Sequence, residues 1–175
     1  MFWNTKPIDL YQRLAKEGQK FWDSNNRSAK LAERGISKRE AYTLASIVEK
    51  ESNDPQEKPT IAGVYLNRLK RGIRLQADPT VVFAVGDFGL RRVLNKHLAH
   101  PSPYNTYLNN GLPPGPICMP SLSSLKAVIN ADDHDYIFFC AKAGEPGKHA
   151  FAATLSEHNN NARKFHRWLD QRGIR

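Results

Sequence analysis

Two glutamates lie close together in the segment SIVEKES, residues 46–52, directly after an apolar run. If this segment is helical, its apolar stripe is formed by three residues, Leu44, Ile47 and Val48. Glu51 occupies the next position on that stripe. Glu49 lies about 200° away around the helix axis and is expected to face solvent. The spacing therefore places the carboxyl group of Glu51 on the side that should be buried.

A buried carboxyl group has a specific chemical use. Desolvation disfavours its charged form and raises its pKa, and a carboxyl with a raised pKa on a rigid helix suits a general acid. Two ordinary interpretations also fit the spacing. The stripe could end at Val48, so that Glu51 lies at a solvent-exposed helix terminus. Alternatively, Glu51 could pair with a nearby arginine.

The surrounding sequence predicts a chain that is mostly helical with a minor sheet. The motif SKRE, opened by Ser37, has the form of a capping box before a helix over about 38–52. Gly72 marks the end of a second predicted helix over about 56–71, in which Pro59 falls in the first turn. Three further helices are predicted over 8–23, 121–131 and 155–172, and two strands over 135–141 and 149–154.

Two segments lack a clear periodic pattern. The run RLQADPTVVFAVGD combines a proline-bounded turn with a short apolar run of ambiguous type. Residues 101–121 contain six prolines interleaved with large apolar side chains. A long loop of this kind inside a compact domain is usually functional.

The composition limits the class of protein. The chain has 175 residues and a formal net charge of +9, which suggests an anionic partner such as nucleic acid, a membrane surface or an acidic polymer. No apolar run approaches the roughly 18 residues needed to span a bilayer, and no signal peptide is visible, so the chain as given is expected to be soluble. Cys118 and Cys140 are expected to be free thiols.

Five stretches resemble the endolytic murein transglycosylases of the MltG (YceG-like) family. They are LASIVEKES, AGVYLNRLKRGIRLQADPTV, YNTYLNNGLPPGPI, SLKAV and GKHAFAATLSEHN, in the family's order across roughly residues 36–165. The resemblance implies an α+β, mostly helical fold, with a lysozyme-like helical catalytic core and a small antiparallel β-hairpin. It also implies a lytic transglycosylase that cuts the MurNAc–β-1,4–GlcNAc bond of peptidoglycan and leaves 1,6-anhydroMurNAc ends.

The family's catalytic glutamate matches Glu51, the residue that the helical face also selects. Its implied role is to protonate the glycosidic oxygen and then to accept the proton of the MurNAc C6 hydroxyl. Supporting substrate-binding roles are expected for six residues, Asn67, Gln76, Asp78, Tyr104, Asn105 and Tyr107. The family needs no metal and no cofactor, and the histidine spacing shows no metal site. His149 and His158 are expected to be structural or supporting residues.

Two other functions remain open on the sequence. A hydrolytic muramidase would use the same Glu51, with water as the nucleophile and a second carboxylate, for which Asp78 is the candidate. A basic nucleic-acid-binding module would use the positive charge, but the basic residues are dispersed and no recognisable nucleic-acid motif is present. Nucleic acid is therefore not expected as a partner.

The expected organisation is a helical lead-in over residues 1–35 and a YceG-like catalytic domain over residues 36–175. The family's membrane anchor and LysM-like domain are not found in this sequence. The resemblance implies a parent protein anchored in the cytoplasmic membrane, with this domain in the periplasm or on the outer side. It implies action on nascent peptidoglycan strands, with peptidoglycan synthases as a candidate partner. A monomer is expected.

Overall fold

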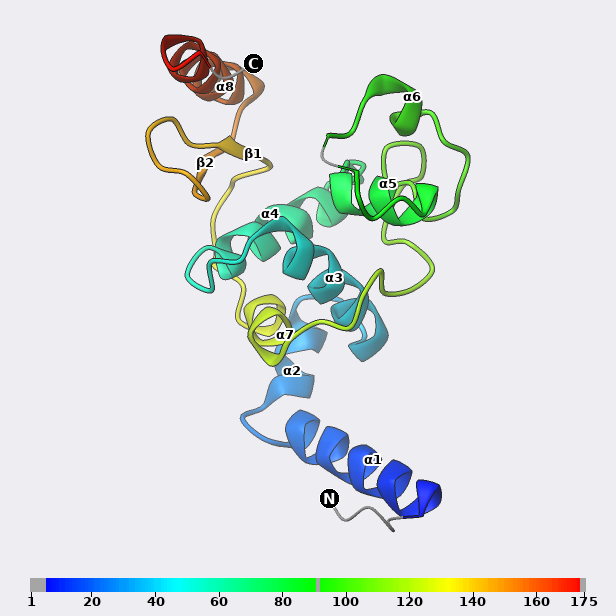
Figure 1. The fold of residues 1–175 in the computed structure, drawn as a ribbon. Coiled ribbons are helices and arrows are strands. Elements are labelled where there is room, and N and C mark those ends of the chain that lie inside the picture. Colours follow the sequence, from blue (N-terminus) through cyan, green and yellow to red (C-terminus); the bar gives the residue numbers. More distant parts are fainter. Residues whose placement is uncertain (1–5, 91, 174–175) are drawn as a thin grey trace. The chain divides into compact units, whose positions relative to one another are not determined.

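The computed structural model describes residues 6–90 and 92–173 (Figure 1). The chain divides into two compact units, Met1–Lys38 and Arg39–Arg175. The sequence interpretation placed its boundary three residues earlier, after residue 35. That the second unit is a catalytic domain stays a prediction.

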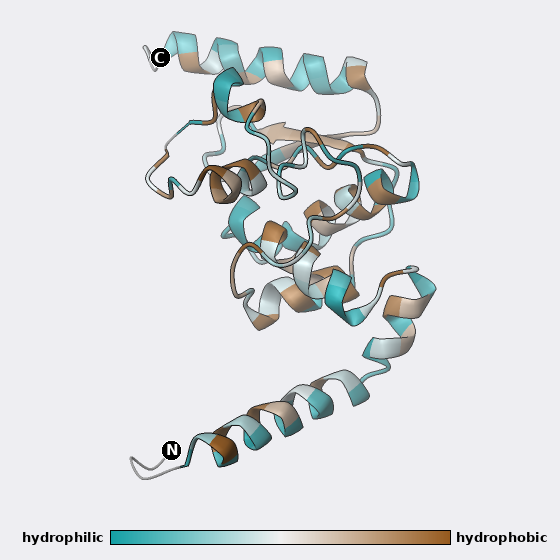
Figure 2. Ribbon diagram, turned by 90° about the vertical axis from the view of Figure 1, so that its right-hand side faces the viewer, coloured by the Kyte–Doolittle hydropathy of each residue, from teal (hydrophilic) through white to brown (hydrophobic). Residues whose placement is uncertain are grey.

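The first unit contains two helices, α1 (Pro7–Asp23) and α2 (Arg27–Glu33). The predicted helix over 8–23 is confirmed. Its apolar residues appear as separate brown turns on a largely teal helix in Figure 2, and only Trp22 among them is buried. Asn25 and Asn26 adopt left-handed backbone conformations between the two helices, which asparagine tolerates better than most residues.

The centre of the second unit is formed by α3 (Lys38–Glu51) and α4 (Lys58–Lys70), in agreement with the predicted helices. Pro59 lies in the first turn of α4, and Gly72 takes a left-handed conformation just beyond its end. The burial of α3 extends beyond a single stripe. Ala45 and Ser46 are as fully buried as Leu44, so most of the circumference of α3 is withdrawn from solvent.

Helix α7 (Leu122–Ile129) packs against α4. The predicted serine cap is confirmed, because Ser121 Oγ accepts a hydrogen bond from the backbone N–H of Ser124. The segment that follows α7 also lies close against α4. A Cβ atom at Gly63 would lie 2.6 Å from His134 Nε2 and 2.7 Å from the Asp132 carbonyl oxygen. Glycine is therefore needed at this position for the segment to pack.

The ambiguous segment after residue 76 forms helix α5 (Asp78–Val85), with proline in its first turn and Gly86 in a left-handed conformation at its end. A short helix, α6 (Asn95–Leu98), precedes the proline-rich loop. The loop over 101–121 has no helix or strand. The Thr106 hydroxyl accepts a hydrogen bond from the Ala77 N–H at 3.0 Å, which fastens the loop to the start of α5.

The two predicted strands form an antiparallel hairpin, β1 (Phe138–Ala141) and β2 (His149–Ala152), in which Phe139 pairs with Phe151. Helix α8 (Leu155–Gln171) packs against both strands (Figure 1). Its first turn is closed by a capping box between Thr154 and Glu157. The predicted α+β, mostly helical fold is confirmed. None of the helices in the described residues is long and apolar enough to cross a membrane.

Candidate active site

Glu51 is the last residue of α3, and its carboxyl group contacts α4. The Tyr65 hydroxyl donates a hydrogen bond of 2.5 Å to Glu51 Oε1. Tyr65 is buried, and its ring lies edge-on to Phe139 of β1 at a centroid distance of 5.9 Å. Glu51 is thus held where the central helices meet the hairpin.

The environment of Glu51 raises its pKa to about 7. Desolvation by burial is the main cause, and the negative charge of Asp78 adds to it. The hydrogen bond from Tyr65 and the positive charge of Arg68 act in the opposite direction, but they are outweighed. A carboxyl group with this pKa can both donate and accept a proton near neutral pH.

Glu51 and Asp78 lie at the junction of two hollows, which together form a cleft with two arms. The larger arm, of about 680 Å³, is lined mainly by apolar side chains, with Lys50 and Arg92 as its cations. The smaller arm, of about 200 Å³, is mostly polar. Besides Glu51 and Asp78, its lining consists of Tyr65, Arg68, Leu75, Gln76, Tyr107 and Phe139. A polymer that passes through the cleft would cross the Glu51 carboxyl group.

Asp78 and Tyr107, two of the predicted substrate-binding residues, lie together in this cleft. Asp78 is the first residue of α5, and the Tyr107 hydroxyl donates a hydrogen bond of 2.6 Å to its Oδ1. Burial and the bond to Asp78 raise the pKa of Tyr107 well above its ordinary value. The tyrosine therefore stays a hydrogen-bond donor at any ordinary pH.

Gln76, another predicted residue, lines the smaller arm in a left-handed backbone conformation with φ of 51°. Its Oε1 accepts a hydrogen bond from Arg68 Nη1 at 3.2 Å. Arg68 is itself buried, and it also donates to the backbone carbonyls of Ile137 and Leu75. A left-handed non-glycine residue is locally strained, and such strain is often found at functional sites.

The structure places the other three predicted residues differently. Asn67 donates hydrogen bonds to the backbone carbonyls of His134 and Tyr136, so its amide holds the segment before β1. Asn105 is fully buried and donates to the carbonyls of Leu98 and His100. Tyr104 packs its ring against Phe83 at 4.8 Å. None of these three lines either arm of the cleft in the described residues.

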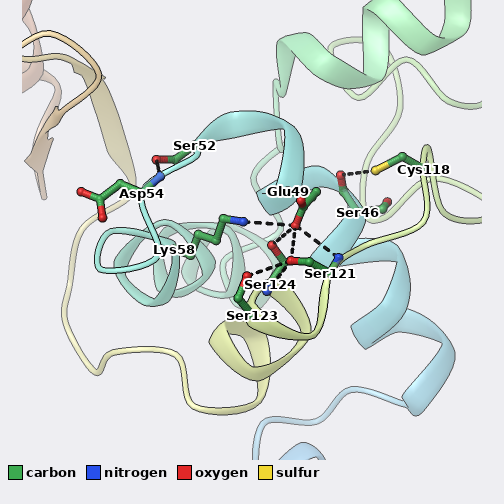
Figure 3. Close-up of polar contacts among 9 residues, drawn as sticks. All are labelled: Ser46, Glu49, Ser52, Asp54, Lys58, Cys118, Ser121, Ser123 and Ser124. Carbon is green, nitrogen blue, oxygen red and sulfur yellow. Dashed lines mark hydrogen bonds and ion pairs between the residues drawn. The ribbon is translucent and has the colours of Figure 1, made fainter. Parts of the chain in front are cut away.

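The expectation that Glu49 faces solvent is wrong. Four donors converge on its Oε2 (Figure 3): Lys58 Nζ at 3.1 Å, the Ser121 hydroxyl at 2.6 Å, the Ser121 N–H at 3.3 Å, and the Ser124 hydroxyl. Burial alone would raise the pKa of Glu49, but these hydrogen bonds outweigh it and lower the pKa to about 2. Glu49 is therefore a partly buried anion that ties α3 to the first turn of α7.

The loop after Glu51 is fastened to the hairpin by two further contacts. His149 Nδ1 lies 2.9 Å from Glu57 Oε2, and Lys148 forms an ion pair with Asp54. His158 stacks on Phe138 at 5.2 Å, and its Nδ1 is buried without a hydrogen-bond partner in the described part of the chain. Among those residues, no group of three or more histidine, cysteine or acidic side chains is arranged to hold a metal ion.

The sequence matches the model of the YceG-like family over residues 1–164. The chain belongs to the YceG-like family. Two similar curated proteins are both named endolytic murein transglycosylase. One, from Bacillus subtilis, is 38% identical over 162 residues, which are 93% of this chain and 44% of that protein. The other, from Streptococcus pneumoniae, is 36% identical over 135 residues, which are 75% of this chain and 24% of that protein.

The fold is likewise similar to the crystal structure of a YceG-like protein from Listeria monocytogenes. The TM-score is 0.76 at 36% sequence identity, and the match covers 91% of this chain and 52% of that chain. This YceG-like chain therefore spans less than half the length of the curated relatives that it matches.

The sequence interpretation of this YceG-like chain missed Tyr65, Arg68 and Phe139 as parts of the site. One signal was available, because tyrosine brings a hydroxyl group that must find a partner when it is buried. Arg68 offered a similar signal, since a buried guanidinium group requires several acceptors.

Proposed function

We propose that this chain is the catalytic part of a lytic endotransglycosylase that cleaves the MurNAc–β-1,4–GlcNAc bond within peptidoglycan glycan strands. The observation that carries this proposal is a carboxyl group with a pKa of about 7 at the junction of a two-armed cleft. The curated relatives, whose names specify murein transglycosylase activity, support the choice of substrate.

The proposed reaction uses Glu51 as both acid and base. The protonated carboxyl group donates its proton to the glycosidic oxygen, and the GlcNAc leaving group departs as positive charge develops at MurNAc C1. The resulting carboxylate then accepts the proton of the MurNAc C6 hydroxyl, whose oxygen bonds to C1. The product is a 1,6-anhydroMurNAc end, and no water is consumed. Because the substrate supplies the nucleophile, the protein has to position it and exclude water.

The two arms of the cleft are proposed to bind the strand on either side of the cleaved bond. In the smaller arm, Gln76 and Tyr107 present polar groups, as sugar hydroxyl and amide groups require. In the larger arm, Phe83 and Phe88 offer ring surfaces. For Asn67, Tyr104 and Asn105, we propose that they shape the segments around the cleft instead of contacting the strand.

A hydrolytic muramidase is the second candidate, because a further carboxylate is present in the cleft. Asp78 lines both arms together with Glu51. If Asp78 positioned a water molecule at C1, the product would be a reducing end. Asp78 accepts a hydrogen bond from Tyr107, which fixes one of its oxygens. The product therefore distinguishes the two candidates: a reducing end identifies the muramidase, and a 1,6-anhydro end identifies the transglycosylase.

The remaining expectations concern the whole protein. The names of the murein transglycosylase relatives support a function in the cell envelope, which we propose for this protein. We further propose a parent protein that is anchored in the cytoplasmic membrane and acts on strands as they are synthesised, beside peptidoglycan synthases. The net charge of +9 suits a substrate whose stem peptides carry carboxylates.

The test is digestion of purified glycan strands by the wild-type chain and by the Glu51→Gln variant, with mass spectrometry of the products. Glu145→Gln is a matched control, because Glu145 lies in the exposed hairpin turn and pairs only with Lys142 among the described residues. We expect internal cuts with anhydro ends from the wild type and from the control, and none from Glu51→Gln. Reducing ends would identify a muramidase. Absence of cleavage by both the chain and its full-length parent would contradict the proposal.

A further inference from the structure

The two oxygen atoms of the Glu51 carboxyl group have different surroundings. Oε1 accepts the hydrogen bond from Tyr65, and Oε2 has no hydrogen-bond partner among the described residues. Among the described residues, His158 Nδ1 is the only side-chain nitrogen or oxygen atom that is fully buried and lacks a hydrogen-bond partner. Oε2, which also lacks a partner, is therefore not fully buried, and Glu51 lines both arms of the cleft.

The Tyr65 hydroxyl is suited to act as a fixed donor. Its side chain is only 1% exposed. Burial and the neighbouring Glu51 raise the pKa of Tyr65 well above its ordinary value, so the phenol keeps its proton. A phenol that donates to Oε1 leaves the proton of a neutral Glu51 on the other oxygen, because a carboxylic acid carries only one proton.

We propose that Tyr65 is a positioning residue, which holds Oε1 of Glu51 and thereby directs the reacting proton to Oε2, the unpaired oxygen that is not fully buried. The proposal rests on the acid–base role of Glu51 in the proposed transglycosylase reaction. It assigns Tyr65 no contact with the substrate. The same oxygen that donates the proton to the glycosidic bond is also the one available to take it back from the C6 hydroxyl.

Other charged groups around Glu51 act through space. Arg68 from α4 favours the ionised carboxylate, and Asp78 from α5 opposes it. Tyr107, from the proline-rich loop, shares the smaller arm, and β1 contributes only the uncharged Phe139 there. Lys50 and Arg92 line the larger arm with Glu51. Tyr65 alone among the described residues donates a hydrogen bond to this carboxyl group.

The variant that tests the proposal is Tyr65→Phe, because phenylalanine preserves the edge-on contact with Phe139 and removes only the hydroxyl. A hydrogen bond to a charged group favours the ionised form, so its loss should raise the pKa of Glu51 by about one unit. The basic limb of the pH profile of kcat/KM should move to higher pH by the same amount. The acidic plateau should fall by no more than about twofold, since the proton is then shared between two oxygens.

The direct measurement is an NMR titration of the Glu51 carboxyl group in carboxyl-labelled protein, assigned by its absence in Glu51→Gln. Tyr107→Phe is the matched control for this titration, because it removes a hydroxyl that bonds to Asp78 and retains the bond at Oε1. We expect the control to move the Glu51 titration by less than half as much as Tyr65→Phe. An unchanged titration in Tyr65→Phe would overturn the proposal, whatever the enzymatic activity.

A ring-fluorinated tyrosine at position 65 gives a second test that does not depend on the folding of Tyr65→Phe. A more acidic phenol is a stronger donor, so the pKa of Glu51 should fall instead of rise. An upward shift or no shift would contradict the proposal. Shifts in the expected directions without any anhydro product would support the positioning by Tyr65 and overturn only the transglycosylase function.

Discussion

Glu49 and Glu51 lie two residues apart at the end of one helix, yet their carboxyl groups have opposite properties. The pKa of Glu49 is lowered to about 2, whereas that of Glu51 is raised to about 7. Both side chains are partly withdrawn from water. The difference lies in the donors that each carboxyl group meets, which are four at Glu49 and one at Glu51.

The comparison shows that burial alone does not make a general acid. At Glu49, Lys58 and the first turn of α7 replace the lost water, and the carboxylate becomes a permanent anion. At Glu51, the cleft removes water, and Asp78 adds a second negative charge. One helix end therefore carries a structural anion and a titratable acid, separated by a single lysine.

The largest expected effect is the loss of activity in Glu51→Gln. Removal of a general acid and base lowers the rate by about a thousandfold or more, whereas Glu49→Gln should retain the pH profile of any remaining activity. Initial rates on glycan strands over a range of pH would measure both. A Glu51→Gln variant within tenfold of the wild-type rate would show that the catalytic acid lies elsewhere.

The second prediction concerns stability. Glu49→Gln leaves the buried ammonium group of Lys58 without its counter-ion, and the free energy of unfolding should fall by about 3 kcal/mol. Denaturant unfolding measures this loss. The double variant Glu49→Gln/Lys58→Met should regain part of it, because it removes the unpaired charge. Equal stability of Glu49→Gln and the wild type would mean that the four hydrogen bonds contribute no net stability.

The third prediction is that the two glutamates give stability opposite dependences on pH. The pKa of Glu49 lies below its ordinary value of 4.5, so its contribution is present above that pH and is lost as the pH falls toward 2. The pKa of Glu51 lies above 4.5, so stability is lost as the pH rises through about 7. Glu51→Gln should therefore be more stable than the wild type at pH 8 by about 3 kcal/mol, and equally stable at pH 4. Unfolding curves at these two pH values test the sign.

The smallest expected effect is that of Asp78→Asn. Loss of this negative charge should lower the pKa of Glu51 by about half a unit, as expected for a charge that acts through space. The direction is opposite to that expected for Tyr65→Phe. The basic limb of the pH profile of kcat/KM and the NMR titration of Glu51 should both move to lower pH. Complete loss of cleavage in Asp78→Asn would favour the muramidase, in which Asp78 has a chemical role.

Much of the fold could be predicted from the sequence because its signals are local. Helical spacing, the cap at Ser121 and the turn at Gly72 predicted elements that the structure confirms to within a few residues. Helix α5 was less clear, because its short apolar run fits a strand as well as a helix. Pro79 in its first turn and Gly86 at its end are signals that favour the helix, but the sequence analysis left the segment undecided.

The site could be predicted only in part. Gln76, Asp78 and Tyr107, three of the expected substrate-binding residues, line the cleft with Glu51. That they bind substrate stays a prediction. Asn67 and Asn105 do not, because a sequence does not tell whether an amide will bind a ligand or the protein's own backbone carbonyls. Both are occupied by carbonyls of segments that reach them only in the folded chain.

The sequence by itself determined that Glu51 lies on the apolar side of its helix and that the chain carries the motifs of the YceG-like family. Only the tertiary structure decided what each glutamate meets there. Ser121 and Ser124 reach Glu49 from more than 70 residues away, and Tyr65 and Asp78 approach Glu51 from two other elements. A helical period fixes the direction of a side chain, but its pKa depends on donors, charges and water exclusion that distant segments supply.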